Sequence, residues 1–124
     1  LVEIVVTGAE TDMEARRIAD TVANSNLTKT ALFGEDANWG RILAAVGRAG
    51  VAVAPEKTDI HFGPVLMVQN GMGCGYSAEA EATKVLKQSE FDITIDLKSG
   101  KGHASVLTCD FSIDYVKINA DYRS

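Results

Sequence analysis

Cysteine and tryptophan are scarce in this sequence: its 124 residues include two cysteines, Cys74 and Cys109, and one tryptophan, Trp39. Two widely separated cysteines are too few for a disulfide framework or a zinc site, and we expect both to be buried reduced thiols. No apolar run approaches the roughly 18 residues of a membrane-spanning helix. The first residues, 1–6, lack the basic region and cleavage site of a signal peptide. These absences predict a cytoplasmic protein that does not cross a membrane.

Basic residues are outnumbered as well: 12 Lys and Arg stand against 17 Asp and Glu, for a formal net charge of −5. This balance argues against nucleic acid or an anionic membrane surface as a partner. The hydrophobic share of 46% and the charged share of 23% are ordinary for a globular protein, so residues 1–124 fit a single domain. The chain opens at Leu1 inside an apolar run, without a Met or loose leading residues. This start predicts a segment cut from a longer polypeptide.

The pattern of apolar residues predicts helices and strands in mixed order. Helical spacing is clear at 11–23, with a capping box at Thr11, at 39–46, and at 77–87, where Ser77 is the expected N-cap. Strict alternation predicts a strand at 91–98, which the turn 99–102 joins to a partner strand as a hairpin. The remaining expected elements are strands at 1–7, 30–33 (strand or loop), 51–54, 59–62, 65–69 and 103–110, and a short helix at 114–120. This order indicates the α+β class: an α/β roll with a mixed sheet and helices packed mainly on one face.

The most strongly patterned stretch of the sequence is Thr28–Gly50. A polar corner, Gly34–Asn38, leads there into a helix with one apolar face. The side chains that we expect to be buried on this face are Trp39, Ile42, Leu43 and Val46. Asp36 and Asn38 are both suitable N-cap residues. Glu35 and Asp36 can also be regarded as an acid/base pair, but neighbouring carboxylates at a helix start favour a capping role.

A glycine-rich segment, Gly71–Gly75, precedes a predicted helix and has the form of a phosphate cradle. No Lys-Ser or Lys-Thr pair follows it and no acidic ribose partner can be placed, so a flexible turn is the simpler interpretation. His61 and His103 lie far apart, and neither has a His, Cys or carboxylate at ligand spacing. The sequence therefore predicts no metal site.

The C-terminal tail carries several groups that recognise amino acids. Within six residues it offers the carboxamide of Asn119, the guanidinium of Arg123, the hydroxyl of Ser124 and a chain-terminal carboxylate. Such groups can bind the α-carboxylate and α-amine of an amino acid. A frayed chain end is the alternative interpretation.

Several motifs carry a family resemblance that covers nearly the whole chain. They are Lys29-Thr30-Ala31-Leu32-Phe33-Gly34 followed by Asp36-x-Asn38-Trp39-Gly40-Arg41, the early Val6-Thr7-Gly8-Ala9, and the ending Tyr115-Val116-x-Ile118-Asn119-Ala120-Asp121-Tyr122. Together they resemble the glutamate/ornithine N-acetyltransferases of arginine biosynthesis. That resemblance implies an N-terminal-nucleophile-type α/β enzyme. In such a family, a precursor cleaves itself before a threonine, and this threonine passes acetyl from N-acetylornithine to glutamate in a ping-pong cycle.

For this chain the resemblance implies the C-terminal segment of the β chain. It implies no catalytic residue here, because the nucleophile and the oxyanion hole belong to other segments, and no cofactor, although some members accept acetyl-CoA as a substrate. The implied partners are the α chain and the N-terminal part of the β chain, in an α2β2 heterotetramer. The family's last substrate contacts match Asn119 and Ser124, although many members have Thr where Ser124 stands.

Two alternatives remain open at this point. One is a sister enzyme that acts on other N-acetylated amino acids in secondary metabolism, or an aminopeptidase-like relative with the same nucleophile. The other is a non-enzymatic module that binds amino acids or serves in assembly. An assay with N-acetylornithine and glutamate would distinguish the enzymes from one another. Co-purified α and N-terminal β pieces, found by mass spectrometry, would favour an enzyme over the module.

Overall fold

The computed structural model describes residues 1–109, so the helix predicted at 114–120 lies outside the described residues. The elements in chain order are β1 (Val2–Ala9), α1 (Asp12–Ala23), α2 (Asn26–Phe33), α3 (Trp39–Gly47), the 3-10 turn η1 (Pro55–Lys57), β2 (Asp59–Phe62), β3 (Val65–Gln69), β4 (Met72–Gly73), α4 (Tyr76–Leu86), β5 (Phe91–Asp96) and β6 (Gly102–Thr108).

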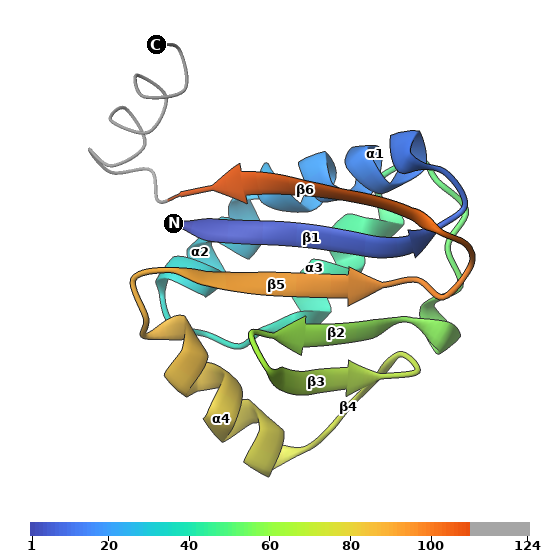
Figure 1. Ribbon diagram of the computed structural model, residues 1–124. Coiled ribbons are helices and arrows are strands. Elements are labelled where there is room, and N and C mark those ends of the chain that lie inside the picture. The colour runs from blue at the N-terminus through green and yellow to red at the C-terminus, as the bar shows by residue number, and fades with distance from the viewer. Residues whose placement is uncertain (110–124) are drawn as a thin grey trace, which may run out of the picture.

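The strands form one six-stranded sheet in the order β4-β3-β2-β5-β1-β6 (Figure 1). The pair β1 and β5 is parallel, and the other pairs are antiparallel. A mixed sheet combined with helices confirms the predicted α+β class.

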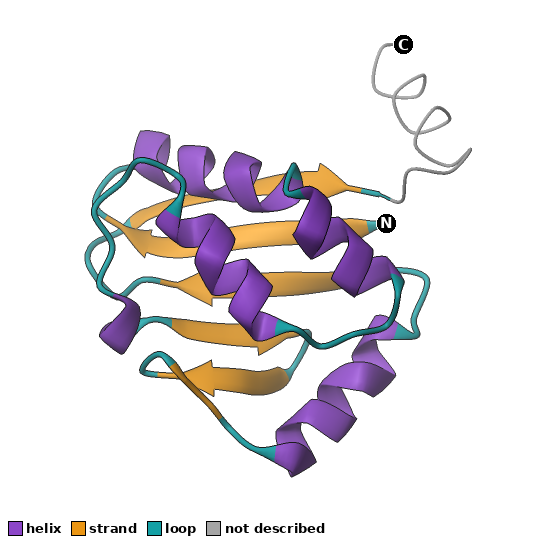
Figure 2. Ribbon diagram, turned by 180° about the vertical axis from the view of Figure 1, so that it is seen from behind, coloured by secondary structure: helices purple, strands orange, loops and turns teal. Residues whose placement is uncertain are grey.

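Helices α1, α2 and α3 cover one face of the sheet (Figure 2). The side chains of Val2, Ile4 and Val6 point to this face and are fully buried, while Glu3 on the opposite face is exposed. This alternation follows from the two-residue period of a strand. Helix α4 packs against β3 and β2. The buried apolar side chains of the strands and helices form one continuous hydrophobic cluster, which holds the sheet against the helices.

The interpretation of residues 30–33 as a strand or loop is wrong, because they form the second half of helix α2. Ser25 caps this helix, and its Oγ accepts a hydrogen bond from the backbone N–H of Thr28 at 3.2 Å. Ala31 and Leu32 are buried against the rest of the core. A short apolar run does not distinguish a strand from a buried helix, and the N-cap five residues earlier is the signal that does.

The strand expected at 51–54 is absent as well. The segment follows Gly50, which has φ +75°, and its backbone is irregular. Val51 and Val53 are partly buried and pack against the core without joining the sheet. The valines of this segment are apolar because they pack against the core. A local sequence pattern does not distinguish such packing from the pairing of a strand in a sheet.

The predicted hairpin between β5 and β6 is also wrong, because β1 lies between these two strands. The connection passes around the end of β1, where the N–H of Leu97 donates to the carbonyl of Thr7 at 2.9 Å and that of Ser99 to the carbonyl of Gly8 at 2.7 Å. These bonds hold the two chain segments together, and they come from residues that are distant in the sequence. The turn residues at 99–102 therefore serve a crossover, not a hairpin.

The helix caps divide into two confirmed predictions and one correction. Thr11 caps α1, accepting from the N–H of Glu14 at 3.1 Å, and Asn38 caps α3, accepting from the N–H of Arg41 at 3.2 Å. Ser77 does not cap α4. The N-cap of that helix is Gly75, two residues earlier, which has φ +95° and no side chain to make a capping bond.

Candidate functional site

The two residues predicted to contact substrate, Asn119 and Ser124, lie outside the described residues. The described chain ends at Cys109, directly after β6, and the register pairs Thr108 of β6 with Val2 of β1. Leu1 and Cys109 therefore lie at the same end of the sheet (Figure 1). This end is the part of the fold from which residues 110–124 continue.

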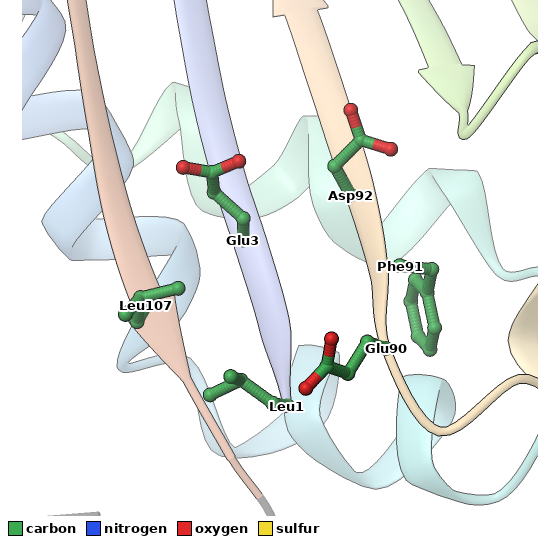
Figure 3. Close-up of a pocket in the computed structure, with 6 residues that line it drawn as sticks. All are labelled: Leu1, Glu3, Glu90, Phe91, Asp92 and Leu107. Atoms are coloured by element: carbon green, nitrogen blue, oxygen red, sulfur yellow. The ribbon is translucent and has the colours of Figure 1, made fainter.

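A cleft of about 330 Å³ opens at this end of the sheet. Figure 3 shows it on the face away from α1, α2 and α3, with the helices behind the strands. Its lining residues are Leu1, Glu3, Glu90, Phe91, Asp92 and Leu107. Glu3 and Asp92 are register partners across the parallel strands β1 and β5, so two carboxylates stand side by side. The cleft thus combines negative charge with apolar walls. Sequence reasoning missed it because these residues meet only through long-range strand pairing.

Buried polar groups join α2 to α3 on the helical side. Ser25, Thr28 and Lys29 are 8%, 1% and 7% exposed. The Oγ of Ser25 also accepts from Nη2 of Arg48 at 3.3 Å, and Nη1 of Arg41 donates to the carbonyl of Leu27 at 3.2 Å. This part of the stretch 28–50 is therefore a structural junction. The predicted buried face of α3 is confirmed for Ile42 and Val46, whereas Trp39 and Leu43 are only partly buried.

Glu35 and Asp36 are exposed in the corner between α2 and α3. Asn38, not Asp36, caps the helix that follows. Oδ2 of Asp36 accepts a long hydrogen bond, 3.4 Å, from Nδ2 of Asn38. Neither carboxylate caps α3, so the predicted capping role of Glu35 and Asp36 is not confirmed, and Asp36 only contacts the residue that does cap the helix.

The glycine-rich loop packs against Trp39. A Cβ added to Gly73 would lie 2.8 Å from Cζ2 of Trp39, and one added to Gly71 would lie within contact of the carbonyl of Pro55. The groove beside it, about 460 Å³, is lined by Trp39, Gly71, Met72, Gly73, Gly75, Tyr76 and Glu79. Among these lining residues the only charged side chain is that of Glu79, whose negative charge disfavours phosphate. The glycines thus serve close packing, and the geometry does not favour a phosphate cradle.

A polar cluster lies where β2 begins and the strands antiparallel to it, β3 and β5, end. Nζ of Lys98 lies 2.9 Å from Oδ1 of Asp59 and 3.0 Å from Oδ1 of Asn70, whose backbone N–H donates to Asp59 at 2.9 Å. Partial burial alone would raise the pKa of Asp59. The bond from Asn70, the ammonium of Lys98 and a smaller contribution from His61 outweigh it, so this pKa lies below its ordinary value. Asn70 and Lys98 both have positive φ, 50° and 54°. The cluster offsets this strain by fixing both turns to β2.

The cysteines differ in exposure: Cys109 is buried as expected, but Cys74 is exposed, which corrects the prediction of two buried thiols. His103 is exposed, and its Nδ1 lies 3.7 Å from Oδ1 of Asp12.

Within residues 1–109, no group of three or more His, Cys, Asp or Glu side chains is placed to hold a metal ion. No helix in the same range is long and apolar enough to cross a membrane.

The ArgJ family model matches residues 1–124, the full length of the chain. This chain belongs to the ArgJ family. It is 62% identical over 124 residues to a protein of Desulfotalea psychrophila and 55% identical over 123 residues to one of Geobacter sulfurreducens, both named arginine biosynthesis bifunctional protein ArgJ. The matches cover 100% and 99% of this chain. It spans only 32% and 31% of those relatives, so about a third of their length.

A solved ArgJ structure shares the fold. The crystal structure of arginine biosynthesis bifunctional protein ArgJ from Bacillus halodurans superposes with a TM-score of 0.84 at 43% sequence identity. The superposition covers 98% of this chain and 57% of that one. The mixed sheet with helices mainly on one face is therefore an ArgJ-family fold.

Proposed function

We propose that this ArgJ-family chain is the C-terminal segment of the β chain of an acetyltransferase that moves acetyl from N-acetylornithine to glutamate. The family match over all 124 residues carries the proposal, and the names of the relatives support it. Because the chain spans about a third of those relatives, the remaining machinery belongs to other segments. These are the α chain and the N-terminal part of the β chain, produced by self-cleavage of one cytoplasmic precursor and assembled as α2β2.

The proposed reaction passes through an acetyl-threonine. The Oγ of a threonine on another segment attacks the acetyl carbonyl of N-acetylornithine, with the threonine's own amine as base. The amide C–N bond breaks, ornithine leaves with the proton, and an acetyl ester remains. The amine of glutamate then attacks the ester, its proton returns to the threonine Oγ, and N-acetylglutamate leaves. Acetyl-CoA can replace N-acetylornithine as the donor, and no cofactor takes part.

This chain contributes substrate contacts and no catalytic group. In the proposal, Asn119 supplies a carboxamide and Ser124 a hydroxyl, which hydrogen-bond the polar groups of the amino-acid substrates. The supporting observation is the match to the family through the C-terminal end. Residues 1–109 form the folded part of the chain, and the tail that carries both residues follows Cys109.

The test is an acetyl-transfer assay on the complete enzyme that carries this segment, with N-acetylornithine and glutamate. We expect acetylglutamate to form, mass spectrometry to show separate α and β chains, and residues 1–124 alone to be inactive. Transfer only from other acetylated amino acids would replace this proposal by the sister enzyme. Binding of amino acids by a cleaved, folded enzyme without any transfer would favour the non-enzymatic module.

A further inference from the structure

We propose that the acidic cleft, formed by Leu1, Glu3, Glu90, Phe91, Asp92 and Leu107, is a docking surface. Its occupant is a lysine- or arginine-bearing segment from the part of the enzyme that this chain does not span. The inference rests on the proposed function in assuming a longer enzyme. It goes beyond that function in naming the surface and the chemistry of its partner.

The first support is an unfavourable register. Glu3 of β1 and Asp92 of β5 are directly paired on the same face of the sheet. Like charges placed opposite each other on neighbouring strands destabilise a sheet. Glu90 adds a third carboxylate to the same cleft. A cation between these groups would convert the repulsion into attraction.

The second support is that the described residues provide no such cation. The ion pairs within residues 1–109 join Arg16 to Asp20, Lys84 to Glu81, Lys98 to Asp59 and His103 to Asp12. None of the three cleft carboxylates takes part in one. Leu1 also lines the cleft, and its backbone nitrogen donates to the carbonyl of Ser89 at 3.1 Å.

The third support is the apolar part of the cleft. Leu107 projects from β6 and is 38% exposed, and Phe91 is partly buried beside Glu90 (Figure 3). Lysine and arginine bury their aliphatic stems on apolar surface while their charged ends reach polar partners. Apolar walls around carboxylates therefore match both parts of such a side chain.

The length of the family polypeptide is the argument for where the occupant comes from. The chain spans about a third of its relatives, which leaves two thirds of the polypeptide to be placed. Leu1 lines the cleft, so any polypeptide joined to it starts at this surface. A second copy related by two-fold symmetry would instead bring the same acidic cleft against itself, which charge repulsion disfavours.

The first experiment uses the sign of a stability change in the complete enzyme. The double variant Glu3→Gln with Asp92→Asn keeps size and shape but removes both charges. With a partner cation in the cleft, we expect the apparent Tm to fall by about 2–4 °C. With no cation, relief of the like-charge pair would leave the Tm unchanged or raise it, and either result overturns the proposal. Glu56→Gln, at an exposed carboxylate of η1, is the matched control and should not shift the Tm.

The second experiment identifies the occupant. The photo-crosslinker p-benzoylphenylalanine replaces Leu107 in the complete enzyme, with the same group at position 56 as control. We expect a crosslink from position 107 to a lysine- or arginine-containing peptide outside the segment 1–124. A crosslink to residues 110–124 of the same chain, a crosslink to this segment of a second copy, or no crosslink would refute the proposal.

The two proposals fail in different ways. Absence of acetyl transfer by the wild-type enzyme would refute the proposed function, but it leaves the crosslink and the Tm shift intact. Conversely, an active enzyme in which position 107 crosslinks to nothing would refute only the docking surface.

Discussion

Gly73 lies against the ring of Trp39, so closely that a Cβ at this glycine would be 2.8 Å from Cζ2. The contact joins β4, at the edge of the sheet, to the first residue of α3. It brings together the glycine-rich loop and the corner of the family motif. Because an aromatic ring is rigid, the chain has little freedom to accept a larger residue at position 73.

We therefore expect Gly73→Ala to destabilise the chain by about 1–3 kcal/mol, the usual cost of overpacking. Urea unfolding followed by the fluorescence of Trp39, the only tryptophan, measures it. Gly47→Ala is the matched control, because a Cβ at that helix end meets nothing within 4 Å. It should be neutral or slightly stabilising. Equal effects of the two substitutions would contradict the packing argument.

The cap of α3 gives a second prediction. Asn38→Ala removes the acceptor for the N–H of Arg41 and should lower stability by about 1 kcal/mol. Asp36→Ala, which removes only a 3.4 Å bond to the cap residue, should have less than half of that effect. Thermal unfolding of both variants measures the two losses of stability. A larger loss for Asp36→Ala would make Asp36 the functional cap.

The pH dependence of stability tests the cluster around Asp59. Its pKa is lower in the folded chain than its ordinary value of 3.8, so the ionised carboxylate stabilises the fold above that value. This contribution disappears as the pH falls through the folded pKa. We expect Asp59→Asn to cost about 0.5–1 kcal/mol at neutral pH, because the pair with Lys98 is partly exposed.

The difference in stability between Asp59→Asn and the wild type should shrink below about pH 4. Urea unfolding measured across the acid range follows it. Lys98→Met removes the ammonium but keeps the bond from the N–H of Asn70, so it should give a partial effect. A difference that grows on acidification would reverse the sign of the argument.

The tail supplies the prediction closest to function. In the complete enzyme, Asn119→Ala and Ser124→Ala should each raise KM for the amino-acid substrates by about 2–10-fold, the loss of one hydrogen bond. Self-cleavage, assayed by gel and mass spectrometry, should continue. Asp121→Ala, between the two positions, is the control. Unchanged kinetics in both variants would mean that the tail makes no substrate contact and is a frayed chain end.

Local pattern was sufficient where one element's own residues decide its structure. The helices at 11–23 and 39–46 and the strands at 59–62 and 65–69 were predictable because the period of apolar residues follows the buried face. The strand predicted at 91–98 is present but ends at Asp96, because Lys98 has φ +54° and leaves the extended backbone. The motif from Lys29 to Arg41 was sufficient to indicate the family, which the full-length match confirms. The substrate contacts Asn119 and Ser124 stay predictions, since they lie outside the described residues.

Local pattern was insufficient where packing or pairing partners are distant in the sequence. The run at 30–33 has strand-like residues, yet the cap at Ser25 and burial against the core make it helical. The pairing of β1 with both β5 and β6 overrides the hairpin that the turn at 99–102 suggests. No window of sequence contains both partners, so local propensity could not choose between them.

The sequence by itself determined the family, the α+β class and most of the elements, because motif and periodicity are properties of contiguous residues. Only the tertiary structure decided that β1 separates β5 from β6. That arrangement sets Glu3 beside Asp92 and opens the acidic cleft next to Leu1. It also places Gly73 on Trp39 and gathers Lys98, Asp59 and Asn70. These relationships depend on which distant segments pair and pack, a choice made by burial of the whole core.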